Sequence, residues 1–365
     1  MNNLNKKYAV VIGRWQLPHN GHFQLIRKAF EVADDVIIVV GSALRARDPS
    51  NPFTWQERVA MLRAGFSGQL SEKQARHVQF VPVRDYANDQ RWCQAVRAGV
   101  QSCTGDSTGA QVVVVGHEKD NTSYYLNLFH PWGLHKVDQK FDGLDATPLR
   151  GVFFGANDVG SALSVLTPMV PSKVLSYLQA WSELPFRQRV SEEKSALEAY
   201  RKDWKFLVAI TGDAVVSVNT SEGRKVLLVR RKGPIGKGLW AIPGGFMNEM
   251  ERVLVTALRE LREETGLEIW EQQVQELLKG VFISETPNRS LRGRILTHAH
   301  HFDLGNHKNP PEVLAGDDAA EVAWVKVSDL PYMLEQLFED HGLILENFFG
   351  NFDDAVRARL VEEAV

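Results

Sequence analysis

The sequence predicts an α/β protein made of two domains. At 365 residues, the chain exceeds the length that one typical hydrophobic core organises. In the first half, short β-branched runs alternate with helical patterns, which is typical of a parallel sheet covered on both faces. From residue 205 onwards, short strand patterns surround one long amphipathic helix, so a second domain of mixed structure follows.

Composition excludes several classes of protein. Hydrophobic residues make up 44% of the chain and charged residues 24%, with a formal net charge of −3, so we expect neither a disordered chain nor a nucleic-acid-binding protein. We expect no membrane segment, because no run of about 18 apolar residues is present, and no signal peptide. Cys93 and Cys103 stand in no metal-binding spacing, and so few cysteines favour a reducing, cytoplasmic location.

The first half of the chain predicts a parallel sheet with its binding loop. Strands are expected at Tyr8–Ile12, Val36–Val40, Val78–Val83 and Val112–Val115, with helices at 23–32, 54–65 and 91–102. Ligands of such sheets bind beyond the carboxyl ends of the strands. The loop after the first strand is therefore the expected site, and its candidate residues are Arg14, Gln16, His19, Gly21 and His22.

Two histidines in that loop predict a phosphate site. Because Pro18 precedes them, His19 and His22 are expected where the chain enters a helix, close to free backbone N–H groups. Two imidazoles there can donate hydrogen bonds to phosphate oxygens, and Gly21 permits close approach. Histidines at this spacing can also be ordinary surface or core residues.

A polar, charge-rich stretch separates the two halves. We expect the first domain at residues 1–182, a linker or connecting helix at 183–204, and the second domain at 205–365. In the second domain, strands are expected at 206–210, 215–218, 226–231, 239–242, 281–285, 294–303 and 322–327, and closing helices near 328–338 and 353–363. Between the first four of these strands, we expect the Gly, Asp and Ser residues to form turns.

The long helix of the second domain, expected at Glu251–Thr265, carries an acidic cluster. Its apolar stripe, Leu254, Leu258 and Leu261, faces the core. On another side, Glu260, Glu263 and Glu264 stand at positions i, i+3 and i+4, where they repel one another unless a cation joins them. Carboxylates suit Mg²⁺, or Mn²⁺, which bridges to substrate phosphates. The alternative interpretation is a solvated acidic face.

With Gly244 and Gly245, this stretch resembles the Nudix hydrolases at every fixed position of their sequence box. The resemblance implies an α/β/α sandwich and metal-assisted cleavage of nucleoside diphosphates linked to another group. It also implies that Glu260, Glu263 and Glu264 hold metal, with Glu263 and Glu264 catalytic, and that Arg259 orients a glutamate. Met250 replaces a glycine that is common just outside the box.

GRWQLPHNGH in the first half resembles the HxGH signature of the nucleotidyltransferases, in the form found in archaeal-type nicotinamide mononucleotide adenylyltransferases. This implies a Rossmann-like fold. Leu17-Pro18 departs from the family's Pro-Phe, and we expect a small consequence. The resemblance implies roles in catalysis for His19, His22 and Arg150, and roles in substrate binding for Arg14, Gln16, Gly21, Asn51, Arg58, Trp92 and Thr147.

For several of these residues a structural role is the competing interpretation. Thr54 is a credible helix cap with Glu57 three residues later. Trp92, the candidate to contact nicotinamide, could equally belong to the core. Pro148 is expected as the first residue of a helix whose start would meet phosphate.

Together the two resemblances imply an enzyme with two activities. The first domain would transfer AMP from ATP to nicotinamide mononucleotide, giving NAD, and the second would hydrolyse ADP-ribose. Other substrates remain open: nicotinate mononucleotide for the first domain, and NADH or dinucleoside polyphosphates for the second. A further alternative is a Nudix half that only senses ADP-ribose or NAD. A homo-oligomer is compatible with the sequence, which leaves the oligomeric state open.

Two features of the second domain are weaker candidates. Glu312 lies in a long polar loop that can supply a general base in related pyrophosphatases, although Glu263 or Glu264 could equally serve. His298, His300 and His301 look like a metal cluster. On a strand, however, His301 faces the side opposite to the other two, so we interpret all three as structural.

Overall fold

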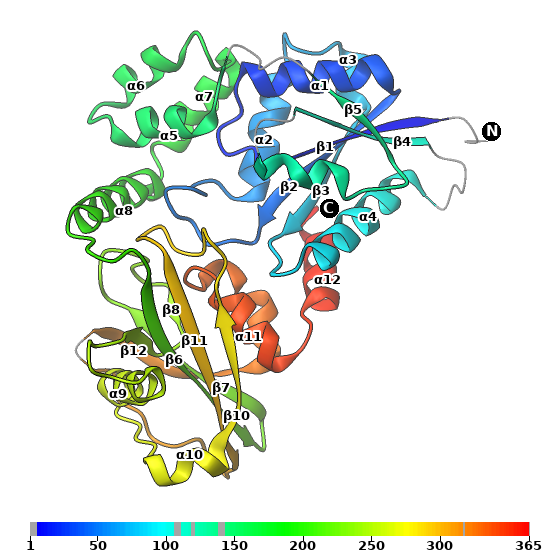
Figure 1. Ribbon diagram of the computed structural model, residues 1–365. Helices are drawn as coiled ribbons and strands as arrows, with labels where there is room; N and C mark the ends of the chain where they lie inside the picture. Colours follow the sequence, from blue (N-terminus) through cyan, green and yellow to red (C-terminus); the bar gives the residue numbers. More distant parts are fainter. Residues whose placement is uncertain (1–5, 106–110, 118–120, 138–142, 317, 365) are drawn as a thin grey trace. The chain divides into compact units, whose positions relative to one another are not determined.

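The computed structural model describes residues 6–105, 111–117, 121–137, 143–316 and 318–364 (Figure 1). It divides into two compact units, residues 1–191 and 192–365. Among the described residues, no helix combines the length and the apolar character that crossing a membrane requires.

The first unit is built on a five-stranded parallel sheet in the order β3-β2-β1-β4-β5. Its strands are β1 (Lys7–Gly13), β2 (Asp35–Ala43), β3 (Val78–Arg84), β4 (Gln111–Gly116) and β5 (Gly133–Lys136). The first four confirm the strands that the apolar runs predict. Strand β5 was not predicted, because this four-residue edge strand is mostly exposed and carries no apolar run.

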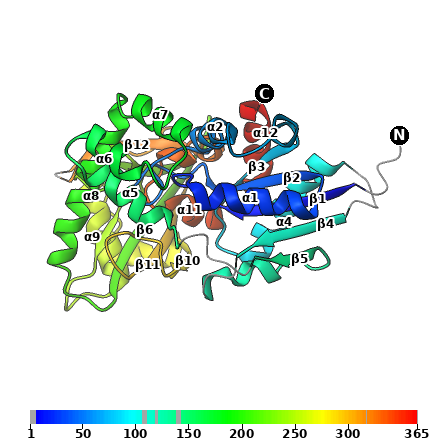
Figure 2. The same cartoon turned by 90° about the horizontal axis from the view of Figure 1, so that it is seen from above.

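Helices cover both faces of this sheet. Those that contact its strands are α1 (Asn20–Val32), α2 (Trp55–Phe66) and α4 (Asp89–Thr104). The other helices are α3 (Glu72–Arg76), α5 (Ala146–Gly155), α6 (Val159–Leu166), α7 (Ser172–Trp181) and α8 (Pro185–Lys202), with a 3-10 turn at Asn121–Asn127. Figure 2 shows α1 running alongside β1. Thr54 caps α2 as predicted, because its Oγ1 accepts a hydrogen bond from the Glu57 N–H and Glu57 Oε2 accepts one from the Thr54 N–H.

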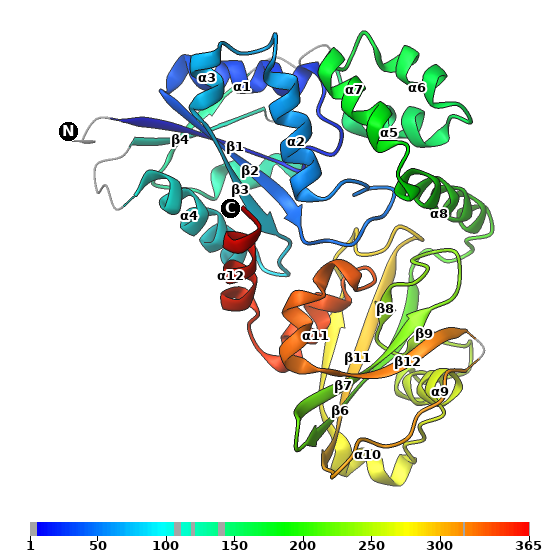
Figure 3. The ribbon, with the colours of Figure 1, turned by 180° about the vertical axis from the view of Figure 1, so that it is seen from behind.

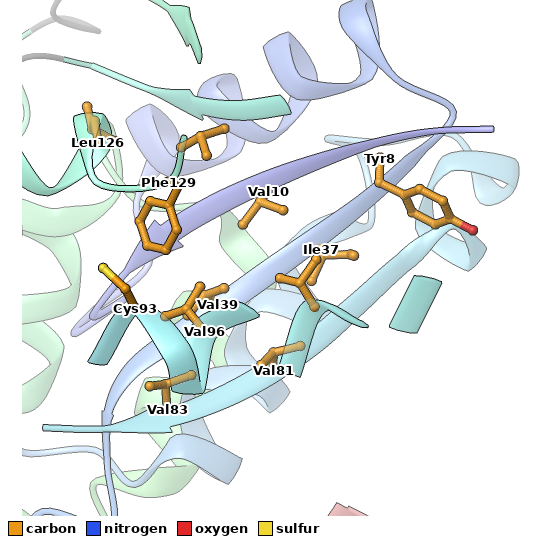
Figure 4. Close-up of a cluster of buried hydrophobic side chains, with 12 residues drawn as sticks. Tyr8, Val10, Ile37, Val39, Val81, Val83, Cys93, Val96, Leu126 and Phe129 are labelled. Carbon is orange, nitrogen blue, oxygen red and sulfur yellow. The ribbon is translucent and has the colours of Figure 1, made fainter. Parts of the chain in front are cut away.

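The alternation of side chains along the strands divides the core between the two faces. Tyr8 and Val10 of β1 point to the side of α4, where they join Cys93, Val96 and Val100 (Figure 4). This packing fixes the strand ends, and hence the loops that follow them, in place. The site of the first unit is assembled from those loops.

The second unit contains a seven-stranded mixed sheet in the order β10-β11-β6-β7-β12, with β8 paired to β7 and β9 paired to β6. The strands are β6 (Ala209–Thr220), β7 (Gly223–Arg231), β8 (Trp240–Ala241), β9 (Gly244–Phe246), β10 (Leu278–Ser284), β11 (Ile295–Asn306) and β12 (Ala319–Lys326). Only β6 and β11 run parallel to each other; the other pairs that the structure describes are antiparallel.

Strand β6 corrects one sequence prediction. We expected two strands separated by a turn at Gly212 and Asp213, but the strand is continuous through both residues. Gly212 is required for a different reason: a Cβ there would lie 2.4 Å from the Val253 carbonyl oxygen and 3.0 Å from the Ala257 nitrogen. The glycine lets helix α9 (Val253–Thr265) pack directly on the strand.

Helices lie on both sides of this second sheet. Helix α9 and helix α11 (His341–Phe349) lie on opposite faces, which gives the predicted α/β/α sandwich (Figure 3). The core-facing residues of α9 are Thr256, Ala257, Leu261 and Thr265, whereas Leu254 and Leu258 are only partly buried. The predicted helix at 328–338 is instead a pair of 3-10 turns, Val327–Tyr332 and Leu334–Gln336, because Pro331 interrupts it. Helix α10 (Glu271–Leu277) was missed, and α12 (Asp353–Ala364) matches its prediction.

Candidate active sites

Two histidines meet at the start of α1 in the first unit. His19 caps the helix, and His22 lies in its first turn beyond the buried Gly21, as predicted. The ring centroids are 3.8 Å apart, and His22 Nδ1 accepts a hydrogen bond from the His19 N–H at 3.2 Å. The His22 proton therefore lies on Nε2, which is a donor. Burial, and then the neighbouring His19, lower the pKa of His22 well below its usual value, so the ring is neutral at pH 7.

The loop before these histidines has an unusual backbone. Trp15 and Leu17 have φ values of 54° and 72°, a region that non-glycine residues rarely adopt. Trp15 Nε1 donates a hydrogen bond to the Val39 carbonyl oxygen at 2.8 Å, which holds the loop against β2. The backbone at Leu17 also differs from that which the family's Pro-Phe would impose, and a small consequence for substrate binding stays a prediction. A proline ring fixes φ near about −65°, so proline cannot occupy position 17 with this backbone.

Three of the predicted substrate-binding side chains connect the loops after β1 and β2. The Gln16 amide donates to Asn51 Oδ1 and to the Phe53 carbonyl oxygen at 3.0 Å, and Gln16 Oε1 accepts from the Phe53 N–H. The Arg58 guanidinium is fully buried and donates to the carbonyl oxygens of Arg14, Gly41 and Ser42. Gln16, Asn51 and Arg58 thus hold the walls of the site in place through contacts within the protein.

Arg150 comes to the same loop from helix α5. Its Nη1 donates to the Gln16 carbonyl oxygen at 3.0 Å, and its Nη2 donates to Thr147 Oγ1 at 3.1 Å. Burial, and then the charge of nearby Arg14, lower the pKa of Arg150 to about 10. Two guanidinium groups that repel each other beside a helix start form a site that an anion would stabilise.

The start of α5 differs from the predicted one. Asp145 caps the helix by accepting a hydrogen bond from the Thr147 N–H at 2.7 Å. Pro148 is therefore the third residue of the helix and not the first. The Asp145 carboxylate therefore serves to cap the helix itself.

Trp92 lies on the hydrophobic core of the first unit. Its half-buried ring packs edge-on against Phe129, at 5.5 Å between centroids, and against Tyr125, at 5.8 Å. These contacts account for the tryptophan as a packing residue. A part of the ring remains exposed, so a contact with a ligand stays a prediction.

In the second unit, the Gly244-Gly245 dipeptide of β9 receives the carboxylates of α9. The Gly244 N–H donates to Glu264 Oε2 at 3.0 Å. A Cβ on Gly245 would lie 2.3 Å from Glu260 Oε1, so only glycine leaves room for this carboxylate. The two glycines of the box therefore position Glu260 and Glu264 on one side of the strand.

Arg259 is the centre of a charged network. It binds both oxygens of Glu251, at 2.9 and 3.1 Å, and also contacts Glu260 at 2.7 Å and Glu263 at 2.9 Å. Glu251 accepts two further hydrogen bonds, from Asn248 N–H and Thr256 Oγ1. These bonds, that of Arg259 foremost, lower the pKa of Glu251 to about 2. No role was predicted for Glu251, although it lies eight residues before Arg259 in the same segment.

The carboxylates of this site have the chemistry that a divalent cation requires, although in this structure they are not gathered around one point. Burial, and to a smaller extent the charge of Glu260, raise the pKa of Glu264 to about 8, and burial also raises that of Glu260. A cation would remove this penalty, and oxygen ligands suit Mg²⁺ and Mn²⁺. Within the described part of the chain, no three acidic, histidine or cysteine side chains are gathered closely enough to hold one ion. Arg259 supplies the positive charge among them, and a cation that bound Glu260 and Glu263 would have to replace the hydrogen bonds that Arg259 donates to them.

The loop that carries Glu312 is fastened to the end of α9. Leu314 N–H donates to the Thr265 carbonyl oxygen at 2.9 Å, and Gly316 N–H donates to that of Glu264 at 3.0 Å. Upstream, Trp324 Nε1 binds the Pro311 carbonyl oxygen at 2.9 Å. Glu312 itself is exposed between these anchors.

The histidines of β11 lie within the sheet. His301 Nε2 shares a hydrogen bond with Ser217 Oγ at 2.9 Å. His300 is buried, and neighbouring residues of a strand point to opposite faces, so the pair is split between the two sides of the sheet.

Comparisons with known proteins agree with this division of the chain. The family model Cytidylyltransferase-like matches residues 10–124, and the model NUDIX domain matches residues 211–348. The nicotinamide/nicotinic acid mononucleotide adenylyltransferase of Acinetobacter baylyi is 32% identical over 192 residues, which cover 53% of this chain and 95% of that protein. The ADP-ribose pyrophosphatase of Methanocaldococcus jannaschii is 33% identical over 166 residues, or 45% of this chain and 86% of that protein.

A solved structure matches across both units. The bifunctional NMN adenylyltransferase/ADP ribose pyrophosphatase of Francisella tularensis is 28% identical, with a TM-score of 0.81, and the match covers 93% of this chain and 97% of that one. A second structure of that protein, complexed with AMP and a Mn ion, matches with a TM-score of 0.80. The chain therefore belongs to the family of bifunctional proteins that join a cytidylyltransferase-like mononucleotide adenylyltransferase domain to a Nudix ADP-ribose pyrophosphatase domain.

Proposed function

We propose that the first unit transfers AMP from ATP to nicotinamide mononucleotide, giving NAD and pyrophosphate. The observation that carries this proposal is the neutral His22 with its Nε2–H donor at the start of α1, close to the loop that Arg150 binds. The names of the relatives support the substrates, and one of them extends to nicotinic acid mononucleotide. The acid mononucleotide is thus a second candidate substrate.

The chemistry at this site is direct displacement. A phosphate oxygen of the mononucleotide attacks the α-phosphorus of ATP; the new P–O bond forms as the bond to the β-phosphate bridge breaks, and pyrophosphate leaves. Such transfer needs alignment and neutralisation of charge more than it needs proton transfer. In our proposal Arg14 and Arg150 neutralise the phosphates, while His19, His22 and Thr147 donate hydrogen bonds to them. Gln16, Asn51 and Arg58 hold the surrounding loops.

For the second unit we propose hydrolysis of ADP-ribose to AMP and ribose 5-phosphate. Glu260, Glu263 and Glu264 would hold Mg²⁺, for which Mn²⁺ can substitute, and the bound ion would polarise phosphoryl oxygens and neutralise developing charge. Arg259 keeps the box helix and the Gly244-Gly245 strand together through Glu251 and the Phe246 carbonyl oxygen. Glu312 is our candidate for the group that deprotonates water, with Glu263 and Glu264 as alternatives.

A product assay tests both halves. The purified chain is incubated with ATP and nicotinamide mononucleotide, and separately with ADP-ribose, each with Mg²⁺, and the products are separated by chromatography. We expect NAD and pyrophosphate from the first mixture, and AMP and ribose 5-phosphate from the second. ADP-ribose that binds but is not cleaved would favour a sensing role for the second unit instead.

A further inference from the structure

Trp181 connects the last helices of the first unit to the loop that follows β2. It is the final residue of α7, and its side chain is buried. Its Nε1–H donates a hydrogen bond to Glu57 Oε1 at 2.8 Å, although 124 positions separate the two residues in the sequence. Helix α7 packs here against α2, near the start of which Glu57 lies (Figure 3). The contact therefore joins two distant parts of the chain at one carboxylate.

The Glu57 carboxylate passes this connection on to the loop after β2. Both Nη atoms of Arg47 donate to it, at 2.6 and 2.9 Å, and the Thr54 N–H donates to Oε2 at 2.8 Å. Arg47 Nη1 also donates to the Pro52 carbonyl oxygen at 2.7 Å. A guanidinium that binds both oxygens of a carboxylate allows little freedom of orientation. The N–H of Trp181 thus belongs to a network that fixes the loop at both of its ends.

The same loop holds the residue to which Arg150 is bonded. The Phe53 N–H donates to Gln16 Oε1 at 3.2 Å, and the Phe53 carbonyl oxygen accepts from the Gln16 amide at 3.0 Å. The Gln16 carbonyl oxygen in turn accepts from Arg150 Nη1 at 3.0 Å. A continuous series of contacts therefore runs from Trp181 through Glu57 and the loop to Arg150.

The ring of Trp181 reaches the same two places by packing. Its centroid lies 4.7 Å from that of Phe53 in the loop, and 6.2 and 6.0 Å from those of Phe153 and Phe154. The last two residues belong to α5, the helix that carries Arg150. One side chain thus sets α5 against the loop to which Arg150 must donate. Small displacements of a group that aligns phosphates are costly for the rate of transfer.

We propose that Trp181 is a positioning residue for adenylyl transfer and that it acts through Arg150. The inference rests on the proposed adenylyltransferase function and adds to it a buried residue that lies outside the loops of the site. Arg150 is proposed to neutralise charge that develops on the phosphates as they react. Displacing its guanidinium should therefore lower kcat more than it raises KM for ATP.

The test measures the kinetic constants of NAD synthesis in Trp181→Phe, which keeps an aromatic ring and removes the N–H. We expect kcat to fall about tenfold, the scale of a lost hydrogen bond within an aligned site, while KM for ATP stays within about twofold. ADP-ribose hydrolysis by the same chain should be unchanged. Trp132→Phe is the matched control, because its ring stacks on Phe129 at 5.4 Å, away from α5, and it should keep the wild-type constants.

A double-mutant cycle with Arg150 separates positioning from general loss of stability. Arg150→Lys keeps the positive charge, so we expect NAD synthesis to remain measurable. In that background, Trp181→Phe should lower kcat by no more than about twofold, because the group through which it acts is already changed. A tenfold fall in both backgrounds would overturn the inference, and so would a kcat of Trp181→Phe within twofold of the wild type.

A second variant covers the case in which Trp181→Phe does not fold. Arg47→Lys breaks the paired contact with Glu57 and should show the same fall in kcat and the same dependence on Arg150. A fall that persists in full in Arg150→Lys would again overturn the inference. Wild-type protein that makes no NAD from ATP and nicotinamide mononucleotide would instead contradict the proposed function.

Discussion

The glutamates around the Nudix box differ in the number of donors that each receives. Glu251 is held by Arg259, Thr256 and Asn248, and its pKa falls to about 2. Glu264 is buried with a single backbone donor, and its pKa rises to about 8. At neutral pH the first is therefore ionised, and the second retains its proton in the metal-free protein. This difference fits a structural role for Glu251 and a metal-binding role for Glu264.

Metal affinity should consequently depend on pH. A metal needs the Glu264 carboxylate, so below pH 8 it must displace a proton. The association constant for Mn²⁺ should rise by up to about tenfold per pH unit between pH 6 and 8 and level off above that. Calorimetric titration of the full chain measures this. Glu312→Gln, at an exposed residue of the neighbouring loop, should keep the same dependence, and an affinity that is flat from pH 6 to 8 would argue against Glu264 as a ligand.

At the scale of elements, local patterns predicted most of the fold. The strands of the first unit and the helix start at His19 follow from runs and turn residues within a short window. The turn predicted at Gly212 was wrong. This glycine is needed because helix α9, about forty residues later in the sequence, packs against it, and not because the chain turns there.

The packing of α9 on β6 can be tested at Gly212. Gly212→Ala places a Cβ against the Val253 carbonyl oxygen and forces the helix away from the strand. The free energy of unfolding of the second unit should fall by about 1–3 kcal/mol, and ADP-ribose hydrolysis should weaken while NAD synthesis persists. Scanning calorimetry with both assays measures this. Gly233→Ala, where a Cβ meets nothing within 4 Å, is the matched control and should change little.

At the scale of the whole molecule, the second unit begins at residue 192, within the segment 183–204 that the sequence predicts to be a linker or connecting helix. Residues 192–202 of α8 contribute to it: Glu193 Oε1 accepts a hydrogen bond from the Gly236 N–H at 2.8 Å, and Arg201 Nε donates to the Leu291 carbonyl oxygen at 2.8 Å. Leu197 is buried as well. The polar sequence predicts a linker or connecting helix here, and its charged residues give no sign of these three contacts with the rest of the second unit.

Two fragments test this boundary. A fragment of residues 192–365 should fold and hydrolyse ADP-ribose, whereas a fragment of residues 205–365 lacks all three anchors and should unfold at a lower temperature. The lost burial of Leu197 and the unpaired Gly236 N–H each cost on the order of 1–3 kcal/mol. Thermal unfolding of the two fragments side by side gives the comparison. Equal midpoints would place the boundary after α8.

The two sites of this chain are expected to work independently of each other. The direct measurement is NAD synthesis and ADP-ribose hydrolysis, assayed in parallel on the wild type, His19→Ala and the Glu263→Gln, Glu264→Gln double variant. We predict that His19→Ala loses only synthesis and that the double variant loses only hydrolysis. Hydrolysis that survives in the double variant, or one substitution that abolishes both activities in a folded protein, would contradict the account.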